Sequence, residues 1–254
     1  MSISAILLAV IFLVSLVLTM VGLGGGLVFS PLFVILGSAK SQAASASLFL
    51  NLTAAASAAY AYSRKKMVDF SLSVPLIAAS ALAAPAGAYL NARIDTKPFL
   101  MVMAVVLAMA AVRMLISPAL KIEGTFAIPP NRKITGSIAI GTCIGLMGGL
   151  LGIGGGVFVV PLLIYVLKTP TKIAAATSTF IVCFSSLAGF LGYAAVAPIN
   201  WSFILPAALA SLLGGQLGAR IMSTRLEAKS IRVIFSLVLF AMCLKLIHRS
   251  VFGF

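Results

Sequence analysis

A glycine-rich string, GLGGGLVFSP from Gly22, returns as GIGGGVFVVP from Gly152, 130 positions later. Both copies lie in apolar stretches long enough to cross a membrane, because a hydrocarbon core of about 30 Å needs roughly 20 helical residues. Glycine clusters that interrupt a transmembrane helix at matching places of two repeats are the best sequence pointer to a transporter's binding site. The string therefore predicts a duplicated membrane chain with its site at the two breaks.

The composition agrees with a polytopic membrane protein of the plasma (bacterial inner) membrane. Of the 254 residues, 62% are hydrophobic and only 9% are charged, whereas soluble domains average about 25% charged residues. The net charge is +14, but the basic residues stand between the apolar runs. Such basic loops are held by anionic membrane lipid and obey the positive-inside rule, so they do not indicate a nucleic-acid partner.

The apolar runs predict an all-α fold with about eight transmembrane helices and two half-helices. The predicted spans are Ile3–Val21, Ser41–Tyr62, Phe70–Asn91, Phe99–Ile116, Ile134–Leu151, Thr171–Ala194, Trp201–Met222 and Ile231–Ile247. Two shorter apolar pieces, Leu27–Leu36 and Val157–Leu167, follow the glycine clusters. At 1.5 Å per residue each covers about 15 Å, half of a bilayer.

The duplication divides the chain into a first transmembrane repeat (1–116), a polar linker (117–133) and a second repeat (134–254). If all eight long runs simply alternate across the membrane, the basic residues split eight against nine and show no bias. If each glycine cluster turns the chain back to the side it came from, the split is twelve against five, as the positive-inside rule requires. The count favours two inverted, pseudo-symmetric repeats with both termini outside.

The glycine clusters themselves are the first candidate binding residues. A half-helix that begins near the midplane offers unpaired backbone N–H groups and a partial positive charge, and glycine lets an anion approach them closely. A small anionic substrate is then bound without a buried lysine. The alternative is that the glycines only allow close packing of helices. The residues assigned to the site are Gly24, Gly25, Gly26, Gly154, Gly155 and Gly156.

The helices that follow carry polar side chains that point to the same site. Ser47 and Asn51 are four residues apart and share a helix face, and Thr177 and Thr179 lie in the corresponding part of the second repeat. The alternative is that such hydroxyls bond a carbonyl one turn back in their own helix or join neighbouring helices.

Three further side chains complete the predicted set. Gln216 needs a partner on a helix of small residues, which suggests that it lines the binding site. Lys40 and Lys172 begin corresponding helices and could line vestibules that attract anions, although lysines at helix ends usually extend toward the interface.

The acidic residues and the single histidine exclude several classes of protein. All four acidic residues fall in connections, and His248 is the only histidine. Neither a membrane metalloprotease nor a Ser–His protease can be built from these residues, so an enzyme, a metal site and a cofactor are not predicted. Carboxylate proton relays inside the bilayer are also absent. An H⁺ or Na⁺ coupling ion and the oligomeric state stay open.

The paired G-x-GGG-x(4)-P strings, each followed by a small-residue helix with Ser or Thr, resemble the TauE/SafE family of membrane transporters. The resemblance covers nearly the whole chain, including VDFSLSVP from Val68 and INWSFILP from Ile199. It implies transport of small sulfur-containing anions such as sulfite, sulfoacetate and other organosulfonates, with the glycine motif as site. The hydroxyl positions differ between the copies, AASASLFLN against AAATSTFIV, so symmetric substrate contacts do not follow.

Three functions are therefore compared. The first is a secondary transporter or facilitator of small anions, such as sulfur oxyanions or organosulfonates. The second is a carrier of another small solute, such as an amino acid or a cation bound by unwound carbonyls. The third is a membrane scaffold subunit, which does not require paired glycine breaks inside the membrane.

Overall fold

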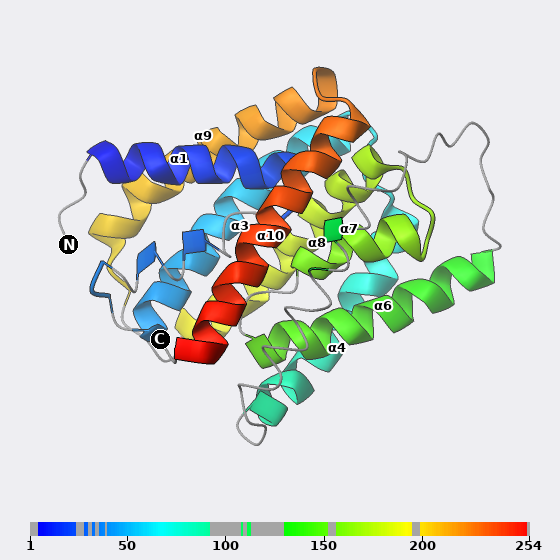
Figure 1. Cartoon of the computed structure of the whole chain (residues 1–254), viewed down its shortest axis with the longest axis horizontal. Helices are drawn as coiled ribbons and strands as arrows, with labels where there is room; N and C mark the ends of the chain where they lie inside the picture. Colours follow the sequence, from blue (N-terminus) through cyan, green and yellow to red (C-terminus); the bar gives the residue numbers. More distant parts are fainter. Residues whose placement is uncertain are drawn as a thin grey trace.

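A computed structural model describes residues 5–23, 28–29, 32–33, 36–38, 40–91, 108, 111–112, 130–151, 156–194 and 199–252. In this part of the chain the secondary structure is eight α-helices, with no strand (Figure 1). The helices are α1 (Ala5–Met20), α3 (Lys40–Arg64), α4 (Phe70–Asn91), α6 (Pro130–Leu151), α7 (Gly156–Tyr165), α8 (Thr171–Ala194), α9 (Trp201–Thr224) and α10 (Ala228–Phe252).

These helices match the predicted spans closely, and the differences lie at the ends. Helix α6 begins at Pro130, before the predicted Ile134, because proline lacks the N–H that would be unpaired in the first turn of a helix. Helix α10 extends past the predicted Ile231–Ile247 at both ends. The predicted span Phe99–Ile116 and the half-helix Leu27–Leu36 lie mostly outside the described residues.

Helices α4 and α9 begin at corresponding positions with the same kind of cap. The Asp69 carboxylate accepts hydrogen bonds from the backbone N–H groups of Ser71 and Leu72 at 3.0 and 3.3 Å. The Asn200 side-chain oxygen accepts from the N–H of Phe203 at 3.3 Å. Asp and Asn are preferred here because their side chains pair N–H groups that have no partner inside the helix.

Small residues bring α1 against α9 and α4 against α6, two of the most extensive helix pairs. A Cβ placed on Gly214 of α9 would lie 3.0 Å from the Cβ of Ser15 in α1, and one on Gly145 of α6 would lie 2.9 Å from the Cβ of Ala83 in α4. Gly214 corresponds to Ala83 in the repeat, and Ser15 corresponds to Gly145. The contact of α1 with α9 and the contact of α4 with α6 are thus both made by small residues, which lie at corresponding positions of the duplicated sequence pattern.

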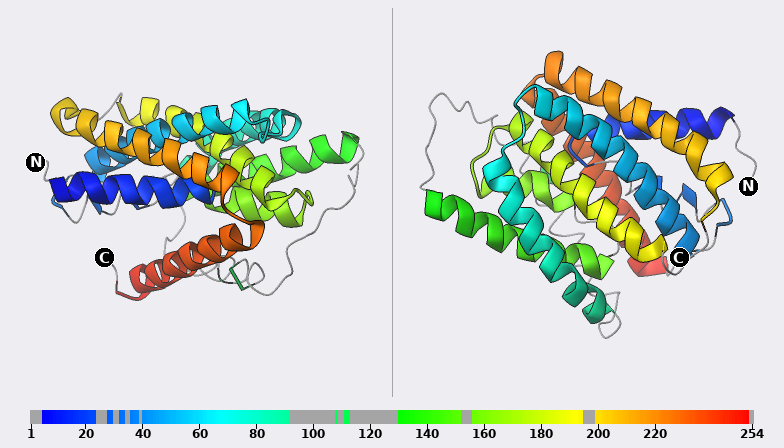
Figure 2. Two further views of the ribbon diagram at one scale, coloured as in Figure 1. Left: turned by 90° about the horizontal axis from the view of Figure 1, so that it is seen from above. Right: turned by 180° about the vertical axis from the view of Figure 1, so that it is seen from behind.

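The contacts also fix the helix directions. Phe12 and Leu16 of α1 approach Gly214 and Gly218 of α9 in rising order, so this pair is parallel, as are α4 and α6. Helices α3 and α8 are antiparallel, and they lie side by side in Figure 2 with opposite chain directions. Helices α1, α3 and α9 therefore run one way, and α4, α6 and α8 run the other way.

One end of the bundle collects most of the described basic residues. It is the end where α3 and α9 finish and where α6, α8 and α10 begin, and in Figure 1 it extends from the top, where α9 ends, to the right edge, where α6 begins. The residues at this end are Arg64, Lys65, Lys66, Arg132, Lys133, Lys168, Lys172, Arg220, Arg225, Lys229 and Arg232. Those near the opposite end are Lys40, Lys245 and Arg249.

The outer surface of the described helices carries many large apolar side chains, and hydroxyl side chains are found among the buried residues. Leu82, Leu209 and Leu237 are 83%, 64% and 62% exposed, whereas Ser15, Ser211 and many other hydroxyl side chains are buried. Hydrocarbon outside and hydrogen-bonded hydroxyls between helices are what a lipid environment favours.

Two described helices contain stretches long and apolar enough to span a membrane, Thr171–Leu191 in α8 and Trp201–Thr224 in α9. Shorter apolar stretches occur at Ala5–Met20, Phe70–Ala83 and Ile134–Leu146. The all-helical class is as predicted. Of the about eight predicted spans, two meet this criterion of length and hydropathy within the part of the chain that the structure describes.

Candidate functional site

The first glycine string ends α1 with a capping motif. Gly22 has a φ of +84°, which residues other than glycine rarely adopt. Its N–H donates to the carbonyl of Thr19 at 3.2 Å, and the N–H of Leu23 donates to the carbonyl of Leu18 at 2.9 Å. These two bonds form a Schellman cap, in which a left-handed glycine closes a helix. Helix α1 therefore ends at Met20, within one residue of the predicted end of the first span at Val21.

The second glycine string also separates two helices. Helix α6 ends at Leu151, and the ten-residue helix α7 begins at Gly156. The predicted half-helix Val157–Leu167 is thus observed as Gly156–Tyr165. Of the predicted site glycines, only Gly156 is described, because Gly24, Gly25, Gly26, Gly154 and Gly155 lie outside the described residues.

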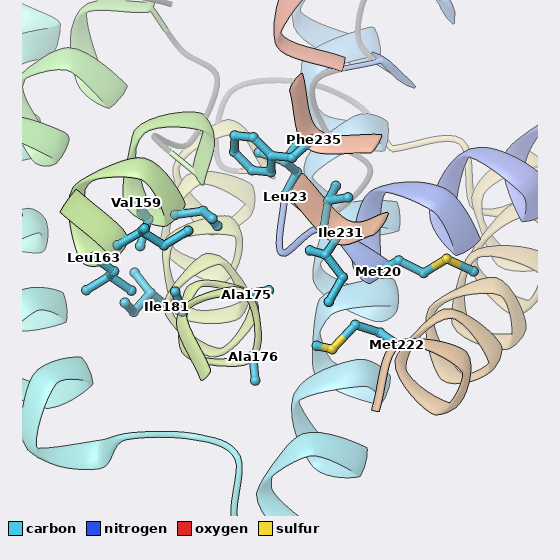
Figure 3. Close-up of a cluster of buried hydrophobic side chains, with 14 of the residues drawn as sticks. Met20, Leu23, Val159, Leu163, Ala175, Ala176, Ile181, Met222, Ile231 and Phe235 are labelled. Carbon is cyan, nitrogen blue, oxygen red and sulfur yellow. The ribbon is translucent and has the colours of Figure 1, made fainter. Parts of the chain in front are cut away.

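The two breaks, 130 positions apart in sequence, approach each other in space. A Cβ on Gly156 would lie 3.2 Å from the carbonyl oxygen of Leu23, and a Cβ on Gly22 would lie 2.6 Å from the carbonyl oxygen of Ala175 in α8. Leu23 and Ala175 belong to a buried cluster shared with α7 and with Phe235 of α10 (Figure 3). Glycine is required at Gly22 because any side chain would meet backbone.

Two buried hydroxyls pair the carbonyls at the end of α1. Ser178 of α8 donates to the carbonyl of Gly22 at 2.7 Å, and the Tyr62 hydroxyl donates to the carbonyl of Thr19 at 3.0 Å. The sequence did not single out Ser178, because its counterpart in the first repeat is Ala46.

Asn51 lies where α3 crosses α8. Its Nδ2 donates to the Oγ of Ser186 at 2.6 Å, and both residues are buried. The Oδ1 of Asn51 is buried without a hydrogen-bond partner among the described residues. Ser47, one turn earlier on the same helix, is buried as well. Among the predicted site residues, Asn51 thus has an oxygen that could still accept a hydrogen bond where α3 crosses α8.

The two threonines of α8 have different partners. Thr177 Oγ1 accepts a hydrogen bond from the N–H of Asp69 at 3.1 Å, where α4 begins. Thr179 Oγ1 donates to the carbonyl of Ala175 at 2.9 Å, one turn back in its own helix. Thr179 therefore makes the bond that the sequence left open as an alternative to substrate contact.

The remaining predicted residues do not join one cluster. Gln216 is half-buried on α9, between glycines that pack against α1 and α3. Lys172 is half-buried at the start of α8, and Lys40 is the first residue of α3. Because α3 and α8 are antiparallel, the two lysines belong to opposite ends of the molecule.

The structure adds a basic residue near the first break. Arg232 in α10 is only 5% exposed and is the buried charged side chain of the described residues. Its neighbours Ile231 and Phe235 belong to the buried cluster that holds Leu23. In the sequence, Arg232 is the second residue of the predicted span Ile231–Ile247 and contributes only to the count of basic residues on one side of the membrane.

A pocket of about 200 Å³ lies at the less basic end, where α3 and α9 begin. It is lined by Gly37, Ser38, Gln42, Ser45, Ile199, Asn200, Phe203 and Ile204. Among the described residues, no group of three or more His, Cys, Asp or Glu side chains is placed to hold a metal ion.

The comparisons with known proteins agree on a transporter family. The model of the family described as sulfite exporter TauE/SafE matches residues 7–246. The chain is 27% identical over 257 residues to "Probable membrane transporter protein YunE" of Bacillus subtilis, which covers 92% of this chain and 94% of that protein.

Two partial matches carry the same kind of name. A "Probable membrane transporter protein" of Xylella fastidiosa is 35% identical over 118 residues, 46% of this chain and 44% of that protein. "Probable membrane transporter protein MamO" of Paramagnetospirillum magneticum is 33% identical over 119 residues, 44% of this chain and 18% of that protein. No solved structure matches the chain. The match over residues 7–246, the apolar outer surface and the paired glycine breaks show that this chain is an integral membrane protein of the TauE/SafE sulfite exporter family.

Proposed function

We propose that the protein is a secondary transporter or facilitator of small anions, with sulfur oxyanions or organosulfonates as its substrates. The observation that carries the proposal is the meeting of the two glycine breaks, where Leu23 lies against Gly156. The family description as sulfite exporter supports sulfur oxyanions as the class. The substrate binds between the two interrupted helices.

The chemistry near the breaks suits an anion. The N-terminus of α7 carries unpaired backbone N–H groups and a partial positive charge. Arg232 is a buried basic residue of α10, and its neighbours Ile231 and Phe235 belong to the same buried cluster as Leu23. Asn51 and Ser186 add a neutral amide and hydroxyl at the crossing of α3 and α8. Such a site attracts an oxyanion and offers it several donors.

The proposed topology is two inverted repeats, 1–116 and 134–254, joined by the linker 117–133. Its support is the opposite direction of α3 and α8 and the corresponding contacts of α1 with α9 and of α4 with α6. The basic end of the bundle then faces the cytoplasm, as the positive-inside rule requires. When a monovalent anion leaves a cell that is negative inside, its free energy falls by about 2.3 kcal/mol for each 100 mV of membrane potential. The membrane potential therefore favours export. The coupling ion, H⁺ or Na⁺, is not specified by this proposal.

The test is flux in proteoliposomes that contain the purified protein. Efflux of radiolabelled sulfite or sulfoacetate should be saturable, should respond to an imposed membrane potential and should be absent from protein-free vesicles. Protein that binds neither anion in a thermal-shift assay and moves neither across the vesicle membrane would contradict the proposal, because a substrate stabilises the state that binds it.

A cation carrier is the second candidate, and one observation favours it. The Oδ1 of Asn51 is a buried acceptor without a hydrogen-bond partner among the described residues, and oxygen atoms are the ligands of Na⁺ and other hard cations. Thermal stabilisation by NaCl relative to choline chloride, lost in Asn51→Ala, would favour the cation. Stabilisation by sodium and choline salts of the same organosulfonate alike would favour the anion.

A further inference from the structure

The pocket at the less basic end has features of a built site. It occupies about 200 Å³ between the first turns of α3 and α9, below the range of about 300–1,000 Å³ that holds drug-sized ligands. Only a small solute fits in it. Both helices begin at this pocket, so their N-terminal partial charges favour a negative group there.

Ser45 supplies a buried hydroxyl to this pocket. It lines the pocket, it is 1% exposed, and its Oγ has no hydrogen-bond partner among the described residues. Burying a hydroxyl without a hydrogen-bond partner destabilises the folded state by roughly 1–3 kcal/mol. A ligand that accepts a hydrogen bond from the hydroxyl removes this cost. The hydroxyl of Ser45 is therefore available to donate a hydrogen bond to a ligand in the pocket.

The neighbouring side chains are neutral and can donate. The Oδ1 of Asn200 is already used by the N–H of Phe203, which leaves the amide N–H groups of Asn200 for a ligand. Gln42 is exposed on the same pocket wall and adds a second amide. Hydroxyl and amide donors beside two helix N-termini suit the oxygen atoms of a sulfonate or a similar small oxyanion.

The corresponding positions at the basic end are arranged differently. Ser45 corresponds to Thr177 and Asn200 corresponds to Asp69. There, the N–H of Asp69 donates to Thr177 Oγ1 at 3.1 Å, so the hydroxyl is already paired. The carboxylate of Asp69 would also repel an anion, whereas the amide of Asn200 does not.

We infer that the pocket formed by Gln42, Ser45 and Asn200 is an entrance or exit site for a small oxyanion, and that its counterpart at Thr177 and Asp69 is closed. The inference rests on the proposed transport of small anions and adds a second, peripheral place where that anion binds. The anion binds at the less basic end and not at the basic end, because the position that is Asn200 in the pocket corresponds to the negatively charged Asp69 at the basic end.

The test uses Trp201, the single tryptophan of the chain, which follows Asn200 and is half-exposed. Purified full-length protein is titrated with isethionate, a small inert sulfonate, at constant ionic strength with chloride as the exchanged anion. We expect a saturable change in tryptophan fluorescence. Ser45→Ala and Asn200→Asp should each weaken the apparent affinity by about tenfold or more, because each removes or opposes a hydrogen bond to a charged group.

The variants are matched to separate charge from folding. Aspartate is as good a helix cap as asparagine, so Asn200→Asp keeps the start of α9 and changes the charge in the pocket. Thr177→Ala alters the equivalent position at the other end and should leave the isethionate affinity unchanged. An unresponsive wild type, or equal affinity in Asn200→Asp, would overturn the inference.

Flux measurements keep the two proposals distinguishable. Sulfite or sulfoacetate flux without any fluorescence response to isethionate would remove the peripheral site and leave the transport function standing. A saturable response that Asn200→Asp abolishes, in protein without anion flux, would support the pocket and contradict the transport function.

Discussion

At the scale of single residues, Gly22 and Ser178 determine how the first break is held. Gly22 ends α1 in a left-handed conformation against the backbone of α8, and Ser178 pairs its carbonyl. The sequence identified the glycine string, because the same string occurs at matching places 130 positions apart. It could not identify Ser178, whose partner lies 156 residues away.

Gly22→Ala should destabilise the protein far more than Gly37→Ala. Both glycines have positive φ, +84° and +88°, so both substitutions strain the backbone. A Cβ on Gly22 would collide with Ala175, whereas one on Gly37 would meet nothing within 4 Å. Thermal unfolding of purified protein in detergent measures the difference. Equal melting temperatures in the two variants would show that the break does not lie against α8.

Ser178→Ala should lower the free energy of unfolding by roughly 1–3 kcal/mol, because it leaves the buried carbonyl of Gly22 without its donor. Thr142→Ala is the control, since Thr142 is exposed and bonds only a carbonyl of its own helix. Denaturant unfolding followed by circular dichroism compares the two variants. Indistinguishable midpoints would contradict the assigned hydrogen bond.

At the scale of elements, the seams between α1 and α9 and between α4 and α6 are built from residues that carry little or no side chain. Gly214, Gly218, Gly141 and Gly145 each face a backbone carbonyl of the neighbouring helix. In lipid, close packing replaces the hydrophobic effect as the force that joins helices. Gly214 and Gly218 are four residues apart in the sequence, so both lie on the face of α9 that meets α1.

Gly214→Val should break the seam between α1 and α9 and prevent stable folding, because its side chain would meet the carbonyl of Phe12. Gly189→Ala should be tolerated within about 1 kcal/mol, since its Cβ would meet only the flexible side chain of Leu48 at 3.2 Å. Size-exclusion profiles and melting temperatures of the two variants check this. A monodisperse, stable Gly214→Val protein would contradict the close contact.

At the scale of the whole molecule, helix directions divide the bundle into a basic end and a less basic end. Lys65 and Arg225 lie at the basic end, and Ser38 lies at the other end beside the pocket. The basic count in the sequence already favoured this division over simple alternation of eight spans. The count could favour this division without any tertiary contact, because the side on which a loop lies depends only on how many times the chain has crossed the membrane before it.

Cysteine labelling should show on which side of the membrane each end of the bundle lies. The three native cysteines are replaced by alanine, and single cysteines are then introduced at Lys65, Arg225 or Ser38. A membrane-impermeant thiol reagent applied to intact cells should label Ser38→Cys only. After the cells are opened, it should label Lys65→Cys and Arg225→Cys as well. Labelling of position 38 and position 65 from the same side would contradict the inverted arrangement.

The sequence by itself determined the helices and their interruptions, because helix formation and glycine caps depend on hydrogen bonds between residues a few positions apart. Spans such as Thr171–Ala194 and Phe70–Asn91 were predicted to the residue. Only the tertiary structure decided that α1 packs on α9, that Ser178 reaches Gly22, and that the hydroxyl of Ser45 has no hydrogen-bond partner among the described residues while that of Thr177 has one. These contacts join residues more than 100 positions apart, and they depend on which helix faces fit each other, which no local pattern encodes.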